Sequence, residues 1–498
     1  MSHSPALASA FNDSKLRSDK ISPGGMCSLC TADCSGTCEL GVAAVLGAAA
    51  VYPTNTGNNQ IASEKNLPLD YSCFNINGRV FGAKGLEENK EPAIFNVKLE
   101  RQIGTRNPVK LALPLILPAL IKLNWPDYFA AAAMAGINCT IGEGSQSKDP
   151  QAKLDDKGRI IAFPKLKEML DSFEKYYRGY GQIIVQCNTD DDAAGLPEIA
   201  LASGAKAIEF KFGQSAKGTQ PANRLKSYDE AVQKQKEGAL VHPDPSDPDM
   251  IALHKKGLDP VFWMYGRLPM WDEAYLCARI EGLRKLGLQN VYFKMAGFDV
   301  KDIETVLRIA SKAEVDLITF DGAGGGSGYS PDKMMNEWGL PALYIEKALI
   351  DICDRMKEEG LPIPAIALTG GFTSEDQVYK ALAIGAPYIT AIGLCRATMA
   401  AAMIGEKIGD ALSKGELFAH FRKFGNTKEE LFLELANLRG LYPDSADSIP
   451  TGALAAYSYL QKIAFGLQHF AALNRKFDIG LADQSDVIAL TKEARDFI

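Results

Sequence analysis

The chain has 498 residues, of which 46% are hydrophobic and 23% are charged, and its formal net charge is −7. This composition is typical of a globular protein with a large core, and the acidic balance argues against a nucleic-acid-binding surface, which normally carries a basic excess. No apolar run approaches the roughly 20 residues that span a bilayer. The Ala-rich run at 42–51 follows a cysteine cluster rather than a basic start, so we expect no signal peptide and a cytoplasmic location.

Residues 1–25 are polar and aperiodic, which predicts a flexible N-terminus. Four of the ten cysteines then follow as Cys27, Cys30, Cys34 and Cys38, and the other six are scattered singly, which does not indicate a disulfide framework. Four thiolates in one compact run predict an iron–sulfur centre of the 4Fe-4S type. Zinc, which more often uses two separated CxxC pairs, and unligated or redox-active thiols are the alternatives.

The cysteines open a segment, residues 26–105, that we expect to wrap around the next domain, with short strands near 79–82 and 94–99. From residue 106 to about 400, apolar β-branched runs alternate with amphipathic helical stretches. This alternation predicts an α/β fold, a (β/α)8 TIM barrel, interrupted by a long insertion before residue 288. The eight expected strands are Leu113–Leu117, Ile137–Ile141, Ile183–Gln186, Ala207–Phe212, Val291–Met295, Val315–Phe320, Ala365–Leu368 and Tyr388–Ile392.

Residues 401–498 are more polar, and we expect a helical C-terminal extension that caps the barrel. The predicted helical segments are 414–424, 428–439, 452–473 and 484–497.

The sixth expected strand runs directly into a glycine-rich loop that includes Gly324, Gly325, Gly326 and Ser327. Because glycines carry no Cβ, such a loop lets a large flat group approach the backbone. A flexible linker is the alternative, but the buried strand before the loop and Pro331 after it argue against one.

The seventh and eighth strands also end in glycines. Gly370 and Gly371 follow the seventh, and Gly393 with Arg396 follows the eighth. In (β/α)8 barrels these two loops often bind a phosphate, through backbone N–H groups at helix starts and through arginine. Tight turns are the alternative explanation for the glycine pairs.

Charged and amide side chains occur at the other strand ends. Lys211 and Lys294 lie inside apolar strands, where an unpaired ammonium group is costly, so we expect an anionic partner such as a flavin or a carboxylate substrate. Glu143, Gln214 and Lys217 lie in the loops after the second and fourth strands.

These motifs resemble the FMN-binding synthase domain of the glutamate synthase family, over roughly residues 90–410. The family's GEGGE is similar to GEGSQ from Gly142, IKIAQGAKPGEGG to FKFGQSAKGTQP from Phe210, and VKL to YFKM from Tyr292. The family's GHDGGTGASP is similar to GAGGGSGYSP from Gly322, and its DGGL and FGTA loops are similar to TGGF and GLCRA.

The resemblance implies an FMN-dependent oxidoreductase acting on CH–NH2 donors. The flavin ring would lie by Gly142, Lys294 and the loop Gly324–Ser327, with its phosphate at Gly370, Gly371, Gly393 and Arg396. Catalytic roles would fall to Glu143, Lys294 and Lys217, and substrate binding to Gln214 and Lys211. Reduced FMN would pass hydride to a 2-imino acid, giving glutamate or a related amino acid, with ferredoxin or a reductase subunit as electron donor. The resemblance is also compatible with a homo-oligomer.

The sequence departs from the family in several places. No cysteine follows Met1 to serve a glutaminase domain, and the cysteines of the cluster lie at the N-terminus rather than near 400–405. The family's His-Asp is Ala323-Gly324 here, and its second glutamate is Gln146. These changes leave two alternatives open. One is an FMN-dependent dehydrogenase or reductase of another small amine or acid, and the other is an electron-relay subunit of a larger complex.

Overall fold

The computed structural model describes residues 67–498 apart from 121–124, 215–217, 219, 221, 324–333 and 335–337, together with residues 44, 45 and 47. Three parts of the predicted site lie outside the described residues. They are the four cysteines Cys27, Cys30, Cys34 and Cys38, the side chain of Lys217, and the loop Gly324–Ser327.

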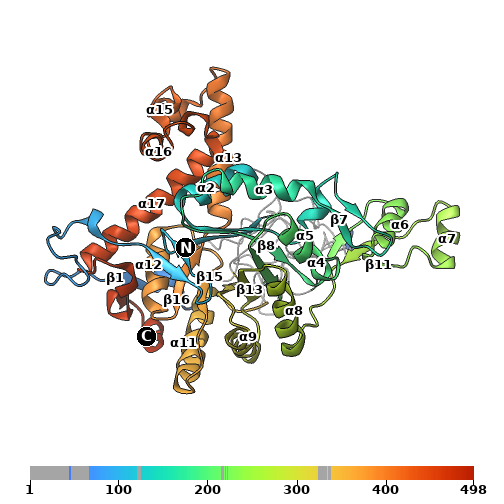
Figure 1. The fold of residues 1–498 in the computed structure, drawn as a ribbon, viewed down its shortest axis with the longest axis horizontal. Helices are drawn as coiled ribbons and strands as arrows, with labels where there is room; N and C mark the ends of the chain where they lie inside the picture. The colour runs from blue at the N-terminus through green and yellow to red at the C-terminus, as the bar shows by residue number, and fades with distance from the viewer. Residues whose placement is uncertain are drawn as a thin grey trace, which may run out of the picture.

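Eight parallel strands close into a barrel, which confirms the predicted (β/α)8 fold (Figure 1). Around the barrel the order is β13-β14-β15-β16-β4-β5-β8-β9, so each strand pairs with its neighbours in the chain and the last pairs with the first. The strands are β4 (Leu115–Leu120), β5 (Asn138–Ile141), β8 (Ile183–Cys187), β9 (Ala207–Lys211), β13 (Asn290–Ala296), β14 (Leu317–Asp321), β15 (Ala365–Thr369) and β16 (Ile389–Gly393).

Helices follow the strands and cover the outside of the barrel. Helix α9 (Val300–Lys312) shows why these segments are helical. The side chain of Asp299 accepts a hydrogen bond from the backbone N–H of Lys301 at its start, and Ile303, Val306, Leu307 and Ala310 repeat at helical spacing and are buried. The other helices of this layer are α2 (Trp125–Ala135), α3 (Pro164–Glu174), α4 (Thr189–Ala193), α5 (Leu196–Ala202), α8 (Glu273–Lys285), α11 (Ala342–Glu358), α12 (Glu375–Ile384) and α13 (Arg396–Ser413).

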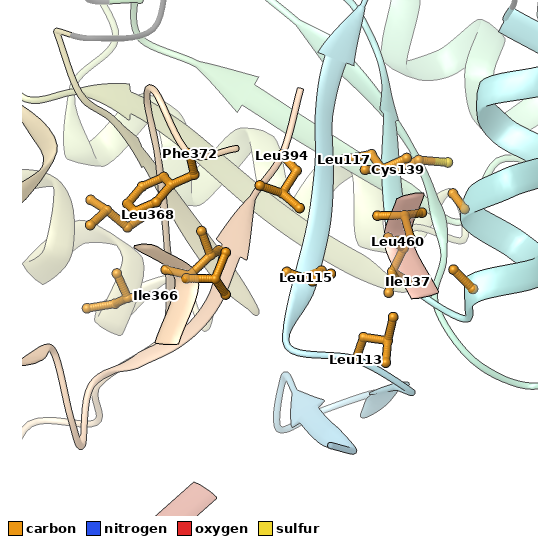
Figure 2. Close-up of a cluster of buried hydrophobic side chains, with 14 of the residues drawn as sticks. Leu113, Leu115, Leu117, Ile137, Cys139, Ile366, Leu368, Phe372, Leu394 and Leu460 are labelled. Atoms are coloured by element: carbon orange, nitrogen blue, oxygen red, sulfur yellow. The ribbon is translucent and has the colours of Figure 1, made fainter. Parts of the chain in front are cut away.

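Alternate residues of each strand contribute to two different cores. Leu115 and Leu117 of β4 are fully buried in the outer core, together with Cys139 of β5 and Leu460 of α17 (Thr451–Leu473), as Figure 2 shows. Ile116, which lies between the two leucines, belongs instead to a smaller cluster inside the barrel. Strands covered on both faces in this way read as continuous apolar runs, which is why their existence was predictable and their inward face was not.

The inner cluster closes the N-terminal end of the barrel. It combines one residue from each of seven strands with Ile103 and Leu111 of a hairpin formed by β2 (Arg101–Ile103) and β3 (Val109–Leu111). The strand residues are Ile116, Ile184, Ala207, Tyr292, Leu317, Ala367 and Ala391. Most polar side chains inside the barrel lie above this plug, toward the C-terminal strand ends, but Asn138 of β5 is buried at the level of the plug, in register with Ile116.

A long insertion separates β9 from β13. It contains a three-stranded antiparallel sheet in the order β10 (Ala222–Arg224), β12 (Trp263–Tyr265), β11 (Leu240–His242), with helices α6 (Tyr228–Lys236) and α7 (Pro248–Lys255). The sheet and these two helices project from one side of the barrel (Figure 1). The sequence predicted the insertion but not its short strands.

Helix α17 packs against α13, α2 and α12. Beyond α13 lie the short helices α14 (Ala419–Arg422), α15 (Lys428–Leu431) and α16 (Leu435–Leu441), so the expected helices at 414–424 and 428–439 are shorter or broken. Among the described residues, no helix is both long and apolar enough to cross a membrane.

The two ends of the described chain meet. Strand β17 (Val487–Ala489) pairs antiparallel with β1 (Phe74–Ile76), so the expected helix at 484–497 is wrong except for α18 (Lys492–Phe497). The side chains of β17 alternate between the interior and solvent, as in a strand, since Val487 is buried and Ile488 is 47% exposed.

The strands expected near 79–82 and 94–99 are also wrong. Val80 and Phe81 are 73% and 89% exposed and belong to no strand, and Ile94–Asn96 is a short 3-10 helix.

Asp127, in the first turn of α2, is half-buried against the start of α17, where it accepts a hydrogen bond from the backbone N–H of Ala453. Burial raises its pKa from 3.8 to about 6, and the carboxylate of Glu406 adds to the rise. Because the folded state holds this proton more tightly than the unfolded chain, Asp127 lowers stability as the pH rises through 3.8 to 6.

We therefore expect Asp127→Asn to raise the free energy of unfolding at pH 8, since an amide oxygen keeps the hydrogen bond without the charge. The gain should disappear at pH 4 and below. Urea unfolding of both proteins at the two pH values measures it, and an equal change at both would contradict the assignment.

Candidate active site

Above the apolar plug, the inward positions of the strands become polar. Each position lies two or four residues beyond a member of the plug, as the alternation of a strand requires. None of these side chains is more than 7% exposed. They are Gln186 on β8, Glu209 and Lys211 on β9, Lys294 on β13, Thr319 and Asp321 on β14, and Thr369 on β15.

Three of the predicted site residues meet in one cluster. The Nζ of Lys211 forms a salt bridge with the Oε1 of Glu143 and donates a hydrogen bond of 3.3 Å to the Oε1 of Gln214. The side chains of Lys211 and Glu143 are 6% and 16% exposed, so the pair is largely withdrawn from solvent. Lys211, predicted to bind substrate, is therefore already paired with a carboxylate of its own chain.

Lys294 lies beside this cluster. The parallel pairing of β13 with β9 places Lys294 opposite Lys211, and Lys294 is itself 5% exposed. Burial lowers the pKa of its ammonium group, but the carboxylates of Asp321, Glu209 and Glu143 and the thiol of Cys395 outweigh burial, and the pKa is raised. Lys294 is therefore charged at neutral pH.

The loop after β5 is held in place by a side chain from the loop after β8. Gly144 has a φ of 64°, and its backbone N–H donates a hydrogen bond of 2.9 Å to the Oδ2 of Asp191. Asp191 also forms a capping box with Asn188 at the start of α4. Burial raises the pKa of Asp191 to about 7, with the charge of Glu143 contributing. Asp191 thus fixes the backbone that carries Gly142 and Glu143.

A small cleft opens beside the Lys211 cluster. It is lined by residues of three strand-end loops and of the insertion: Glu143, Asn188, Thr189, Asp190, Lys211, Phe212, Gly213, Gln214, Gly218, Gly266, Arg267 and Pro269. A small molecule entering this cleft would reach the buried carboxylate and ammonium groups directly.

The glycines after β15 and β16 are required by close chain packing. Gly370 has a φ of 118°, and a Cβ there would lie 2.7–2.9 Å from backbone atoms of Gly322. A Cβ on Gly393 would lie 2.7 Å from the Cβ of Thr369 and 2.8 Å from Pro118. Gly371 has a φ of 96°, and the half-buried Arg396 begins α13. Each of these glycines therefore lets one strand end pack closely on a neighbouring strand end at the barrel mouth, where the sequence predicts a phosphate.

Several polar groups at the mouth were not predicted. Gln186 and Glu209 lie inside β8 and β9, Asp191 is in the loop after β8, Asp321 ends β14, and Cys395 precedes α13. A signal was available for Glu209, because it lies two residues before Lys211 in the same apolar strand and must share its inward face. Burial raises the pKa of Cys395 to about 11, so it remains a thiol at neutral pH.

Within the described part of the chain, no group of three or more His, Cys, Asp or Glu side chains could hold a metal ion. The predicted ligands Cys27, Cys30, Cys34 and Cys38 lie outside that part.

We expect Gly370→Ala to destabilise the protein by more than the roughly 1–2 kcal/mol that a left-handed backbone costs a non-glycine residue, because the added Cβ also meets the backbone of Gly322. Gly360→Ala is the matched control, since Gly360 has a φ of 73° with nothing within 4 Å of a Cβ. Thermal unfolding of both variants measures the difference, and equal losses would refute the packing argument.

Comparisons with known proteins agree with the motifs. Residues 269–403 match the conserved region of glutamate synthase. The chain is 35% identical over 331 residues to the archaeal-type glutamate synthase (NADPH) of Dehalococcoides mccartyi, covering 65% of this chain and 59% of that protein. It is 34% identical over 99 residues, 19% of each chain, to the archaeal glutamate synthase (NADPH) of Archaeoglobus fulgidus. The chain thus spans less than two thirds of these relatives.

Among solved structures, the flavin-binding domain of baker's yeast flavocytochrome b2 is similar with a TM-score of 0.45 at 12% identity, covering 85% of this chain and 78% of that one. A soluble mutant of (S)-mandelate dehydrogenase from Pseudomonas putida gives 0.43 at 12% identity, covering 84% and 88%. The sequence matches confirm the predicted resemblance to glutamate synthases, over residues 269–403 for the conserved region and over 331 residues for the Dehalococcoides mccartyi protein.

Proposed function

We propose that this protein is an FMN-dependent oxidoreductase of the glutamate synthase type, which transfers hydride between reduced FMN and a 2-imino or 2-oxo acid to give glutamate or a related amino acid. The observation that carries the proposal is the buried, charged Lys294 at the barrel mouth, inside the region that matches glutamate synthase. An ammonium group held in this way is suited to oppose the negative charge of a reduced flavin ring.

The described residues fit FMN in two respects. The positive φ at Gly370 and Gly371, with the close packing of Gly370 and Gly393 on neighbouring strand ends, leaves backbone rather than side chains at the place where a barrel binds phosphate. The mouth also offers polar side chains and a cation rather than an apolar surface. We assign the phosphate to Gly370, Gly371, Gly393 and Arg396, and the ring to Gly142, Lys294 and the loop Gly324–Ser327.

Bound FMN would supply reversible transfer of hydride. The chain's own residues would supply the charged and hydrogen-bonding groups around it. The Lys294 ammonium holds its proton and presents a fixed positive charge. Glu143 forms a salt bridge with Lys211, which in turn donates a hydrogen bond to the Gln214 amide at the cleft. We assign catalytic roles to Glu143, Lys294 and Lys217.

The salt bridge between Lys211 and Glu143 bears on how a substrate would bind. A 2-oxo acid carboxylate that enters the cleft would have to compete with Glu143 for Lys211, or use Lys217 and Gln214 instead. Because breaking a buried ion pair leaves an uncompensated charge, we propose that the substrate carboxylate uses Lys217 and Gln214 and leaves the pair intact.

Electrons would enter from ferredoxin or a reductase subunit. We propose that Cys27, Cys30, Cys34 and Cys38 hold a 4Fe-4S cluster that passes them to the flavin, and that the protein works in the cytoplasm. Iron, acid-labile sulfide and zinc assays on anaerobically purified protein test the cluster. Zinc without iron would overturn the cluster proposal and leave the flavin proposal standing.

A single-turnover experiment tests the function itself. The protein is purified with FMN, reduced with dithionite under anaerobic conditions, and mixed with 2-oxoglutarate plus ammonia. We expect the flavin to reoxidise faster than in buffer, with glutamate formed in proportion. A flavin-free protein would refute the proposal, and a flavin that no 2-oxo acid reoxidises would support a relay subunit.

We expect Lys294→Met to slow this reoxidation by roughly 10²–10³-fold, the loss seen when one preorganised electrostatic contact is removed. Lys380→Met is the matched control, because Lys380 is also a buried lysine, 7% exposed, but donates its hydrogen bond to the backbone oxygen of Tyr71 away from the mouth. Stopped-flow absorbance of both variants measures the rate, and equal losses would show a general effect of removing buried lysines.

A further inference from the structure

Glu209 is a buried carboxylate at the barrel mouth to which the proposed mechanism gives no task. It lies in the middle of β9, between the apolar residues Ile208 and Phe210, and is 4% exposed. A charged group in such a place costs stability unless it is paired or hydrogen-bonded. Two neighbours interact with Glu209: the ammonium group of Lys294 and the amide of Gln186.

The strand register places Glu209 diagonally below Lys294, on the neighbouring strand. In the pairing of β9 with β13, Glu209 lies opposite Tyr292 and Lys211 lies opposite Lys294. Side chains two apart on a strand share a face, so Glu209 and Lys294 both point into the barrel. Lys294 lies one inward-facing position closer to the C-terminal strand ends than Glu209. Burial raises the pKa of Glu209, and the attraction of Lys294 opposes that rise, while the charge of Glu209 contributes to the raised pKa of Lys294.

The Gln186 amide fixes the Glu209 carboxylate. Gln186 is 1% exposed, and its Nε2 donates a hydrogen bond of 2.5 Å to the Oε1 of Glu209. Its Oε1 accepts a hydrogen bond of 3.3 Å from the backbone N–H of Glu143. Because the two ends of the amide have different partners, its orientation is determined, and the carboxylate of Glu209 is held against the loop after β5 through Gln186.

The charges at the mouth divide into two groups. Lys211 is neutralised by Glu143 through their salt bridge. Lys294 is the second cation in the same low-dielectric space, and the carboxylates that act on it most strongly are Asp321 and then Glu209. Two ammonium groups on adjacent strands at the same level repel one another, so each needs its own carboxylate.

We propose that Glu209 is a positioning residue that, held by Gln186, fixes the location and offsets the charge of the Lys294 ammonium group. In so far as Lys294 faces a flavin, this inference rests on the proposed function. Glu209 would therefore affect the reduction potential of the flavin. A partly neutralised Lys294 stabilises the anionic reduced ring less than an isolated ammonium would.

The test combines two variants of nearly unchanged shape. Glu209→Gln removes the negative charge beside Lys294, and we expect the midpoint potential of the bound FMN to shift to a more positive value. Glu346→Gln is the matched control. Glu346 is a fully buried carboxyl on α11, bonded to the hydroxyl of Tyr71 at 2.9 Å, and has no part in the mouth. We expect this control to leave the potential unchanged.

A double-mutant cycle with Lys294→Met separates positioning from a general structural effect. Glu209→Gln should shift the potential when Lys294 is present and should have no effect when Lys294 is absent. A shift of the same size in both backgrounds, no shift in either, or a shift in Glu346→Gln as large as that in Glu209→Gln would overturn the inference.

The same cycle can be measured without flavin. In urea unfolding of the flavin-free protein, the two substitutions should be non-additive, because each removes the partner of the other. Additive effects would overturn the pairing of Glu209 with Lys294. Protein that binds no FMN but shows this coupling would refute the proposed function and leave the pairing intact. If Glu209→Gln does not fold, Gln186→Met tests the same arrangement by removing the amide that holds the carboxylate.

Discussion

Two lysine ammonium groups lie side by side inside a protein barrel, largely withdrawn from solvent, and the surrounding structure compensates for their charge. Lys211 has Glu143 as its partner across the mouth. Lys294 has carboxylates on both neighbouring strands, Glu209 on β9 and Asp321 on β14. The apolar plug lies below these groups, toward the N-terminal strand ends, and charges in such low-dielectric surroundings act strongly on one another.

The fold was predictable because each barrel strand is a short run of apolar and β-branched residues that ends in glycine or polar residues. Runs such as Leu317–Asp321 are buried on both faces, so they stand out by composition alone. The same property hides which side chains point inward. Glu143, Lys211, Gln214 and Lys294 were recognised as charged or amide groups at strand ends, and the structure brings all four to one mouth.

Contacts between distant segments were not predictable in this way. Gln186 and Glu209 were missed because a single strand does not reveal that a neighbouring strand supplies the hydrogen-bonding partner. Strand β17 was taken for part of a helix because its stabilisation comes from β1, and the hydrogen bond between Asn77 and Ser485 beside this pairing joins residues 408 positions apart. Local propensity is a weak guide where a distant partner decides the conformation.

The pairing of β1 with β17 has a consequence for how the chain folds. Residues of the early segment cannot reach their final place until a strand made some 400 residues later is available. Tyr71, which donates to Glu346 on α11 and packs its ring 5.3 Å from that of Phe372, must wait for those elements as well. Residues 71–77 are thus docked by parts of the chain that are made late, so the barrel can be largely built before this segment reaches its final place.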